Sequence, residues 1–193
     1  MSGLRNEEIK GGKFLNFKDG KIISAASGQK ESFTNVMGLI TDLDIVDEEY
    51  KGKEYRKIVL FITDDETNTW KLGFPLESGY GTAFCSMAHN LDFSKPADIS
   101  GGIKEMENDK SYGMMFIKQD GKNLKWFYTK ESPEVPKGVK ARDRSGEFWD
   151  YSARNDFFHK MLIEEIRPAI LAAHNGGEVV GDTKNKSRRK KPV

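Results

Sequence analysis

Clusters of acidic residues are the first places where this sequence could do chemistry. Asp42 and Asp44 alternate in one segment, and "DDETN" begins with Asp64 and Asp65. Paired carboxylates can hold divalent metal ions, which raises the hypothesis of a metal-dependent nuclease. The alternative is structural, because Asp in a tight turn accepts hydrogen bonds from backbone amides, and the first pair alternates along an exposed strand face. We favour the structural interpretation and predict no catalytic residue and no metal ligand.

The histidines and the single cysteine also lack a catalytic arrangement. His89, His159 and His174 lie in predicted helical segments, with no Cys or carboxylate at zinc-ligand spacing. Cys85 lies in the apolar stretch "AFCSMA", which favours a buried thiol over a nucleophile. The sequence has neither a glycine-rich phosphate loop nor a dinucleotide fingerprint. It therefore predicts a protein that is not an enzyme and uses no cofactor.

Aromatic and basic side chains are interleaved in "IKQDGKNLKWFYT", which ends with Lys125, Trp126, Phe127, Tyr128 and a threonine. Neighbouring side chains on a strand point to opposite faces, so one core cannot bury all three rings. Two interpretations remain open: a strand packed on both sides, or a platform on which nucleic-acid bases stack. Because Leu124 shares the parity of Trp126, we expect Trp126 to be partly packed, with Tyr128 and Lys125 nearer the rim.

Two earlier segments, "YRKIVLFIT" and "TWKLGF", carry the same mixture of aromatic and basic residues. Aromatic rings stack on any base, while Lys and Arg contact phosphates, so this combination binds single strands without sequence preference. We expect exposure for Tyr55 and Lys57, whereas Trp70 is equally compatible with burial and with stacking. The candidate nucleic-acid-binding residues are Tyr55, Arg56, Lys57, Phe61, Trp70, Lys71, Lys125, Trp126 and Tyr128.

Regular elements must position these residues. A hairpin around Asp19-Gly20 precedes a long strand in "SFTNVMGLITDLDIV", where Met37, Leu39, Leu43 and Ile45 share one parity. Two strands follow, with Ile58, Leu60 and Ile62 on the core parity, which exposes Lys57, Val59 and Phe61. A short amphipathic helix in "SGYGTAFCSMAHNLDF" separates them from two more strands, and the aromatic segment extends the sheet as a sixth.

The C-terminal third has a different character. Residues 131–149 hold prolines and alternating charges, typical of a linker. Residues 150–177 predict a helix with an apolar stripe of Phe158, Leu162, Ile166 and Ile170, kinked by Pro168 and ended by glycines 176 and 177. Such a helix must dock on its own barrel or, by self-association through residues 150–173, on another subunit. Residues 178–193 are expected to be a disordered basic tail.

Composition limits the class of protein. The 193 residues carry a formal net charge of +1, yet residues 1–177 hold 25 of the 31 basic and 28 of the 30 acidic residues, a charge of −3. A uniformly basic nucleic-acid-binding body is thereby excluded, so a binding site must come from local charge distribution. No signal peptide or membrane-spanning stretch is predicted, and one cysteine suits a reducing compartment, so we expect a cytoplasmic protein without membrane partners.

The order of three strands, a helix and two strands resembles the OB-fold, a five-stranded Greek-key barrel. We therefore expect a mainly β protein with helices: an arm and hairpin over 1–31, an OB-fold-like barrel over 32–130 with an extra strand, and the C-terminal helix. "YRKIVLFIT", "TWKLGF" and "IKQDGKNLKWFYT" in that order also resemble bacteriophage single-stranded DNA-binding proteins of the OB-fold type. Many replicative members end in an acidic tail that recruits partners, whereas this chain ends in "SRRKKPV".

The resemblance implies a protein that coats exposed single strands during replication, recombination or repair, in the host cytoplasm if the protein is viral. Single-stranded DNA is the expected partner, with RNA left open. The alternative is a non-enzymatic protein–protein assembly module or virion component built on a small barrel. The mild acidity of residues 1–177 favours this alternative, while the interleaved aromatic and basic residues favour DNA binding.

Overall fold

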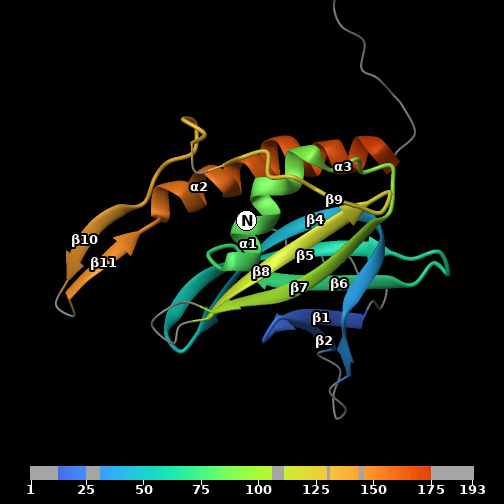
Figure 1. The fold of residues 1–193 in the computed structure, drawn as a ribbon, viewed down its shortest axis with the longest axis horizontal. Helices are drawn as coiled ribbons and strands as arrows, with labels where there is room; N and C mark the ends of the chain where they lie inside the picture. The colour runs from blue at the N-terminus through green and yellow to red at the C-terminus, as the bar shows by residue number, and fades with distance from the viewer. Residues whose placement is uncertain (1–12, 25–30, 106–110, 130, 144–145, 175–193) are drawn as a thin grey trace, which may run out of the picture.

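The computed structural model describes residues 13–24, 31–105, 111–129, 131–143 and 146–174. Within these residues the chain is mainly β, with helices after the third long strand and near the C-terminus (Figure 1). The strands are β1 (Lys13–Lys18), β2 (Lys21–Ser24), β3 (Ser32–Phe33), β4 (Asn35–Tyr50), β5 (Lys53–Thr63), β6 (Thr69–Pro75), β7 (Ala97–Glu105), β8 (Ser111–Gln119), β9 (Lys122–Asn123), β10 (Val139–Asp143) and β11 (Gly146–Asp150). The helices are α1 (Gly79–Met87), α2 (Ser152–Met161) and α3 (Arg167–His174).

Nine of these strands form one mixed sheet in the order β3-β2-β1-β6-β5-β4-β7-β8-β9. Strands β4 to β8, with α1 between β6 and β7, follow the expected order, and β4 pairs with both β5 and β7. The sheet is not closed, because β6 pairs on its free side with β1, in parallel, rather than with β8. The mainly β class with helices is thus confirmed, and the closed five-stranded barrel is not.

The expected hairpin at Asp19-Gly20 joins β1 to β2. Both residues have positive φ, 49° and 74°, the conformation that a two-residue hairpin turn requires. The turn lies against β7, where a Cβ built on Gly101 would come within 2.7 Å of the Gly20 carbonyl oxygen. Phe17 stacks on Tyr80 of α1 with ring centroids 4.3 Å apart, and the Gly20 N–H donates to the Tyr80 hydroxyl. The hairpin therefore packs on both β7 and α1.

Strand β4 changes its buried face part-way along, which corrects the predicted parity. The pairing with β5 shifts register between Ile40 and Asp42, as a β-bulge does. Before the bulge Val36 and Ile40 are buried while Met37 is 58% exposed, and after it Leu43 is fully buried. The expectation that Met37, Leu39, Leu43 and Ile45 share one buried face is therefore wrong at its N-terminal end.

Helices α1, α2 and α3 cover the core on one side of the sheet (Figure 1). Figure 1 shows α2 and α3 running across the sheet beside α1, on the side away from the β1–β2 hairpin. The predicted stripe is confirmed, since the four residues Phe158, Leu162, Ile166 and Ile170 are at most 2% exposed. A π-helical turn, Leu162–Ile166, immediately precedes the turn that holds Pro168, whose ring and missing N–H disturb the preceding hydrogen bonds. The helix thus docks on its own chain.

The sixth strand and the linker differ from their predictions. Only Lys122–Asn123 continues the sheet as β9, and residues 124–129 are irregular, so strand alternation does not apply to the aromatic triplet. The predicted linker contains most of a β10–β11 hairpin, which forms a separate two-stranded sheet projecting from the start of α2 (Figure 1). No helix among the described residues is long and apolar enough to cross a membrane.

Several predictions concern parts of the chain outside the described residues. These are the arm over residues 1–12, the glycines at 176 and 177, and the basic tail over 178–193.

Candidate functional site

A ladder of side chains crosses four strands on the face of the sheet opposite the core. The register places Phe14 of β1 beside Lys71 of β6, Lys71 beside Phe61 of β5, and Phe61 beside Asp42 of β4. We call Phe14, Lys71 and Phe61 the outer ladder. Two of its members were predicted, and Phe14, which is 44% exposed, was missed because it lies in a strand that the resemblance did not include.

Lys71 occupies the centre of the outer ladder between two phenyl rings. Its Nζ lies 5.1 Å from the ring centroid of Phe14 and 5.8 Å from that of Phe61, within the range of cation–π attraction. The residue is 7% exposed, and it forms no ion pair with any described residue. A lysine ammonium that has no carboxylate partner among the described residues can donate hydrogen bonds to a phosphate while the exposed ring beside it stacks on a base.

Tyr55 and Lys57 lie on the same face, but both side chains interact with Glu48. Lys57 Nζ is 3.1 Å from Glu48 Oε1, and the Tyr55 hydroxyl donates to Glu48 Oε2. The hydrogen bond from Tyr55 lowers the pKa of Glu48, and the same bond raises the pKa of Tyr55. The predicted free exposure of these two side chains is therefore wrong, since both are partly buried and paired.

Arg56 and Trp70 point to the other side of their strands and are therefore not part of the outer ladder. Arg56 joins β5 to α2 through Asp156 at 2.8 Å and also contacts Glu77. The Trp70 indole is partly buried, packs edge-on against Phe33 and donates to Asp64 Oδ2 at 3.2 Å. Trp70 is thereby packed rather than free to stack, and Arg56 has a structural role.

The aromatic triplet lies over α1, where its backbone is fixed. The N–H groups of Phe127 and Tyr128 both donate to the Ser86 carbonyl oxygen, at 2.6 and 3.2 Å. Tyr128 is 8% exposed and Trp126 is 45% exposed, which reverses the expected order, while Lys125 is exposed as predicted. His89 stacks on Phe127 at 4.7 Å and pairs with Glu165, so the segment is held between α1 and the C-terminal helix.

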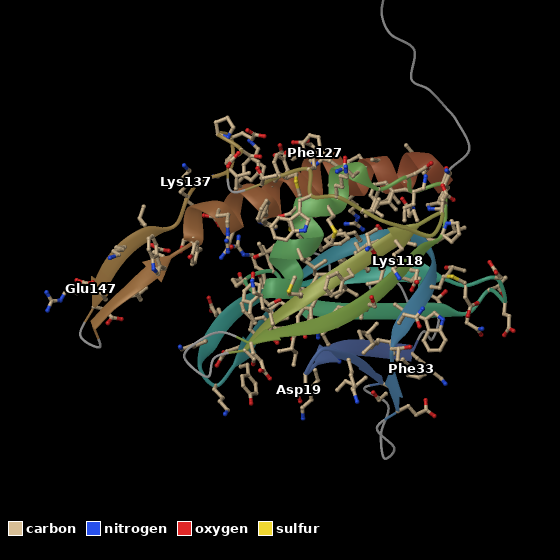
Figure 2. The ribbon with its side chains drawn as sticks, viewed as in Figure 1. Asp19, Phe33, Lys118, Phe127, Lys137 and Glu147 are labelled. Atoms are coloured by element: carbon tan, nitrogen blue, oxygen red, sulfur yellow. The ribbon has the colours of Figure 1, made fainter. Side chains whose placement is uncertain are left out.

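Trp126 and Tyr128 line a cleft of about 450 Å³ between α1, the start of α2 and the β10–β11 hairpin. Figure 2 shows Phe127 over the helices and Lys137 beside the start of β10. Lys137 lines the cleft, and Phe127 lies between two residues that line it, Trp126 and Tyr128. The cleft also holds residues that sequence reasoning missed: Lys137, Trp149, Tyr151 and Arg154. Their signal was present as aromatic and basic residues interleaved over 137–154, a stretch interpreted as a linker up to residue 149 and as the start of the C-terminal helix beyond it.

Asp64 and Asp42 have structural partners, and the turn contacts of Asp64 are those that were predicted. Asp64 accepts hydrogen bonds from the backbone of Glu66 and Asn68, and its contacts, led by the Asn68 side chain, lower its pKa. Asp42 receives two hydrogen bonds from Arg167. Among the described residues no group of three or more His, Cys, Asp or Glu side chains is placed to hold a metal ion. Cys85 is fully buried, and burial raises the pKa of its thiol.

No known protein family, curated protein or solved structure matches this chain.

Proposed function

We propose that this chain is a non-catalytic, sequence-tolerant single-stranded DNA-binding protein that coats exposed strands during replication, recombination or repair. The observation that carries the proposal is the outer ladder, in which Lys71 lies without an ion-pair partner among the described residues, between Phe14 and Phe61. Single-strand binders combine such cations with aromatic surfaces. The proposal includes cytoplasmic action, in the host cytoplasm if the protein is viral, and leaves RNA open as a second partner.

We further propose that the fold is an OB-related barrel, which is open because the β1–β2 hairpin is inserted beside β6. Three observations support it: the order of β4 to β8, the position of α1, and the pairing of β4 with two neighbours. In OB-folds the second and third strands form the usual ligand face, and β5 and β6 would be their counterparts here. The outer ladder crosses both of these strands.

The charge distribution supports stacking as the main source of affinity. Residues 1–177 carry a net charge of −3, so long-range attraction to phosphate from this part of the chain is weak. Duplex DNA hides its base faces, whereas a single strand can place them on exposed rings such as Phe14. The protein should therefore prefer single strands to duplex.

Titration with oligo-dT and with duplex of equal length, at one fixed salt concentration, tests the proposal. We expect tighter binding to oligo-dT, with about 4–16 nucleotides covered per barrel. Phe14→Ala and Lys71→Met should each weaken binding to oligo-dT, the first by about 1–3 kcal/mol if one base stacks on the ring. Lys160→Met, which removes an exposed lysine from α2, is the matched control and should bind like the unaltered chain. Equal affinity for duplex and oligo-dT, or ladder variants that bind normally, would refute the proposal.

The assembly-module alternative stays as the second candidate. Its structural support is a row of exposed aromatic side chains on β8, Tyr112 at 42% and Phe116 at 41% exposed. The apolar stripe of the C-terminal helix, for which self-association was one of two alternatives, is already buried within the chain.

A further inference from the structure

We propose that the cleft between α1, α2 and the β10–β11 hairpin is a pocket for one nucleotide, with the base among its aromatic side chains and the phosphate on Arg154 and Lys137. This site is separate from the outer ladder and goes beyond the proposed coating of strands. The nucleotide can be free or can be one unstacked unit of a strand. Both sources present the same chemistry, a planar ring attached to an anion.

The size and lining of the cleft suit a planar aromatic ligand. Its volume of about 450 Å³ lies within the roughly 300–1,000 Å³ of small-molecule pockets. Thr82 and Ser86 of α1 also line the cleft, and the Ser86 hydroxyl, which donates to the Thr82 carbonyl oxygen, can still accept a hydrogen bond from a base. The aromatic side chains around them come from three parts of the chain: Trp126, Tyr128, Trp149, Tyr151 and Phe158.

The charges of the cleft favour an anion. The described side chains that line it include Lys137 and Arg154 and no carboxylate. Arg154 forms no ion pair within the described part of the chain, and its Nε is buried without a hydrogen-bond partner. A buried N–H left unpaired is costly, and a phosphate oxygen would satisfy it. A neutral proline-rich peptide could occupy an aromatic groove but would leave this group unpaired.

Several of these side chains are already held in place. The Arg154 guanidinium lies 4.3 Å from the centroid of the Tyr151 ring, which stacks in turn with Trp149 at 6.4 Å and 19° between planes. The Tyr151 ring lies so close to Gly138 that a Cβ built there would be 2.3 Å from the ring. Tyr128 is packed against Phe157 and Phe158. Ordering these rings before binding lowers the entropic cost of holding a ligand.

Tryptophan fluorescence reports on the cleft selectively. The chain has three tryptophans, and Trp70 lies outside the cleft, so in Trp70→Phe the signal comes from Trp126 and Trp149 alone. Thymidine 5′-monophosphate should quench it to saturation, thymidine should bind about tenfold or more weakly, and inorganic phosphate should not quench. Arg154→Met in the same background should reduce affinity for the monophosphate to that for thymidine. Arg142→Met, which alters an exposed arginine of β10, is the matched control and should change nothing.

The outcomes separate this pocket from the outer ladder. Lys71→Met should weaken binding of oligo-dT while quenching by the monophosphate persists. If an oligo-dT quenches where the monophosphate does not, and Arg154→Met removes the effect, the pocket takes its nucleotide from a strand and the proposal stands. Quenching by neither, quenching insensitive to Arg154→Met, or quenching only by a proline-rich peptide would overturn it. Circular dichroism establishes that each variant is folded, and Lys137→Met replaces Arg154→Met if the latter does not fold.

Discussion

At the scale of single residues, partners across the sheet decide which lysines are available. Lys57 and Lys71 are both basic residues in strands rich in aromatic side chains, and the sequence makes them equivalent candidates. Register places Lys57 near Glu48 and Lys71 between Phe14 and Phe61. The partners come from other strands, so no local pattern distinguishes Lys57 from Lys71, which has no ion pair among the described residues. This part of the site required the three-dimensional structure.

The acid that holds Tyr55 and Lys57 gives a prediction with a defined pH dependence. Tyr55→Phe removes the hydroxyl that donates to Glu48, and should lower the free energy of unfolding by about 0.5–1 kcal/mol at neutral pH. The expected loss is small because the Glu48 side chain is 39% exposed, so water screens the interaction. The pKa of Glu48 is lowered in the folded state, so this stabilisation is complete above its ordinary value of 4.5 and is lost as the pH falls through the folded-state pKa. Urea unfolding of both chains over this pH range measures it.

The raised pKa of Tyr55 sets the upper limit of the same effect. Its stabilisation is complete below the ordinary tyrosine value of 10.0 and is lost as the pH rises through the folded-state pKa. Tyr112→Phe is the matched control. Tyr112 is exposed, and its hydroxyl forms no hydrogen bond with any described residue. A Tyr55→Phe effect of equal size at pH 3 and pH 7 would contradict the link to Glu48.

At the scale of elements, alternation and helical spacing predicted the order of β4 to β8 with α1 and the C-terminal helix, but not the open nine-stranded sheet. The core parity of Ile58, Leu60 and Ile62 is confirmed because β5 is a regular central strand, but Val59 on the opposite parity, which was expected to be exposed, is only 6% exposed. Alternation failed in β4, where a bulge reverses the faces, and in residues 124–129, where backbone N–H groups bond to Ser86 of α1 instead of a strand. The β10–β11 hairpin was missed because its charged residues resemble those of a loop. The failure at residues 124–129 concerns hydrogen bonds to a distant part of the chain, whereas the β10–β11 hairpin is formed by neighbouring residues.

The close approach of β4 to β5 at Gly38 gives a prediction at this scale. A Cβ built on Gly38 would lie 2.4 Å from the Thr63 carbonyl oxygen and 2.8 Å from its carbon, and these backbone atoms are fixed by the sheet. Gly38→Ala should therefore destabilise the protein by about 1–3 kcal/mol through overpacking. In the control, Gly102→Ala, the new Cβ meets only the Phe116 ring, which is 41% exposed and can move. Thermal unfolding that shows equal losses for the two variants would mean that β4 can shift at Gly38.

At the scale of the whole molecule, charge and stacking surfaces lie in different parts of the chain. The last sixteen residues hold six of the 31 basic residues and two of the 30 acidic ones, while both proposed stacking sites lie among the residues that the structure describes. Electrostatic attraction to phosphate falls with salt, whereas stacking hardly depends on it. The two contributions can therefore be separated by measuring affinity over a range of salt concentrations.

Deletion of residues 178–193 should weaken binding of oligo-dT mainly at low salt. Each phosphate contact on a single strand contributes about −0.7 to the slope of log affinity against log salt, so losing six basic residues can reduce the magnitude of the slope by up to about 4. Phe14→Ala should instead lower affinity by a similar factor at every salt concentration and leave the slope unchanged, because it removes stacking alone. Slopes measured for the intact chain and the two variants test both expectations. If the deletion abolishes binding at all salt concentrations while Phe14→Ala and Phe61→Ala bind normally, the outer ladder does not contact DNA, and the assembly-module alternative becomes the better account of the residues that the structure describes.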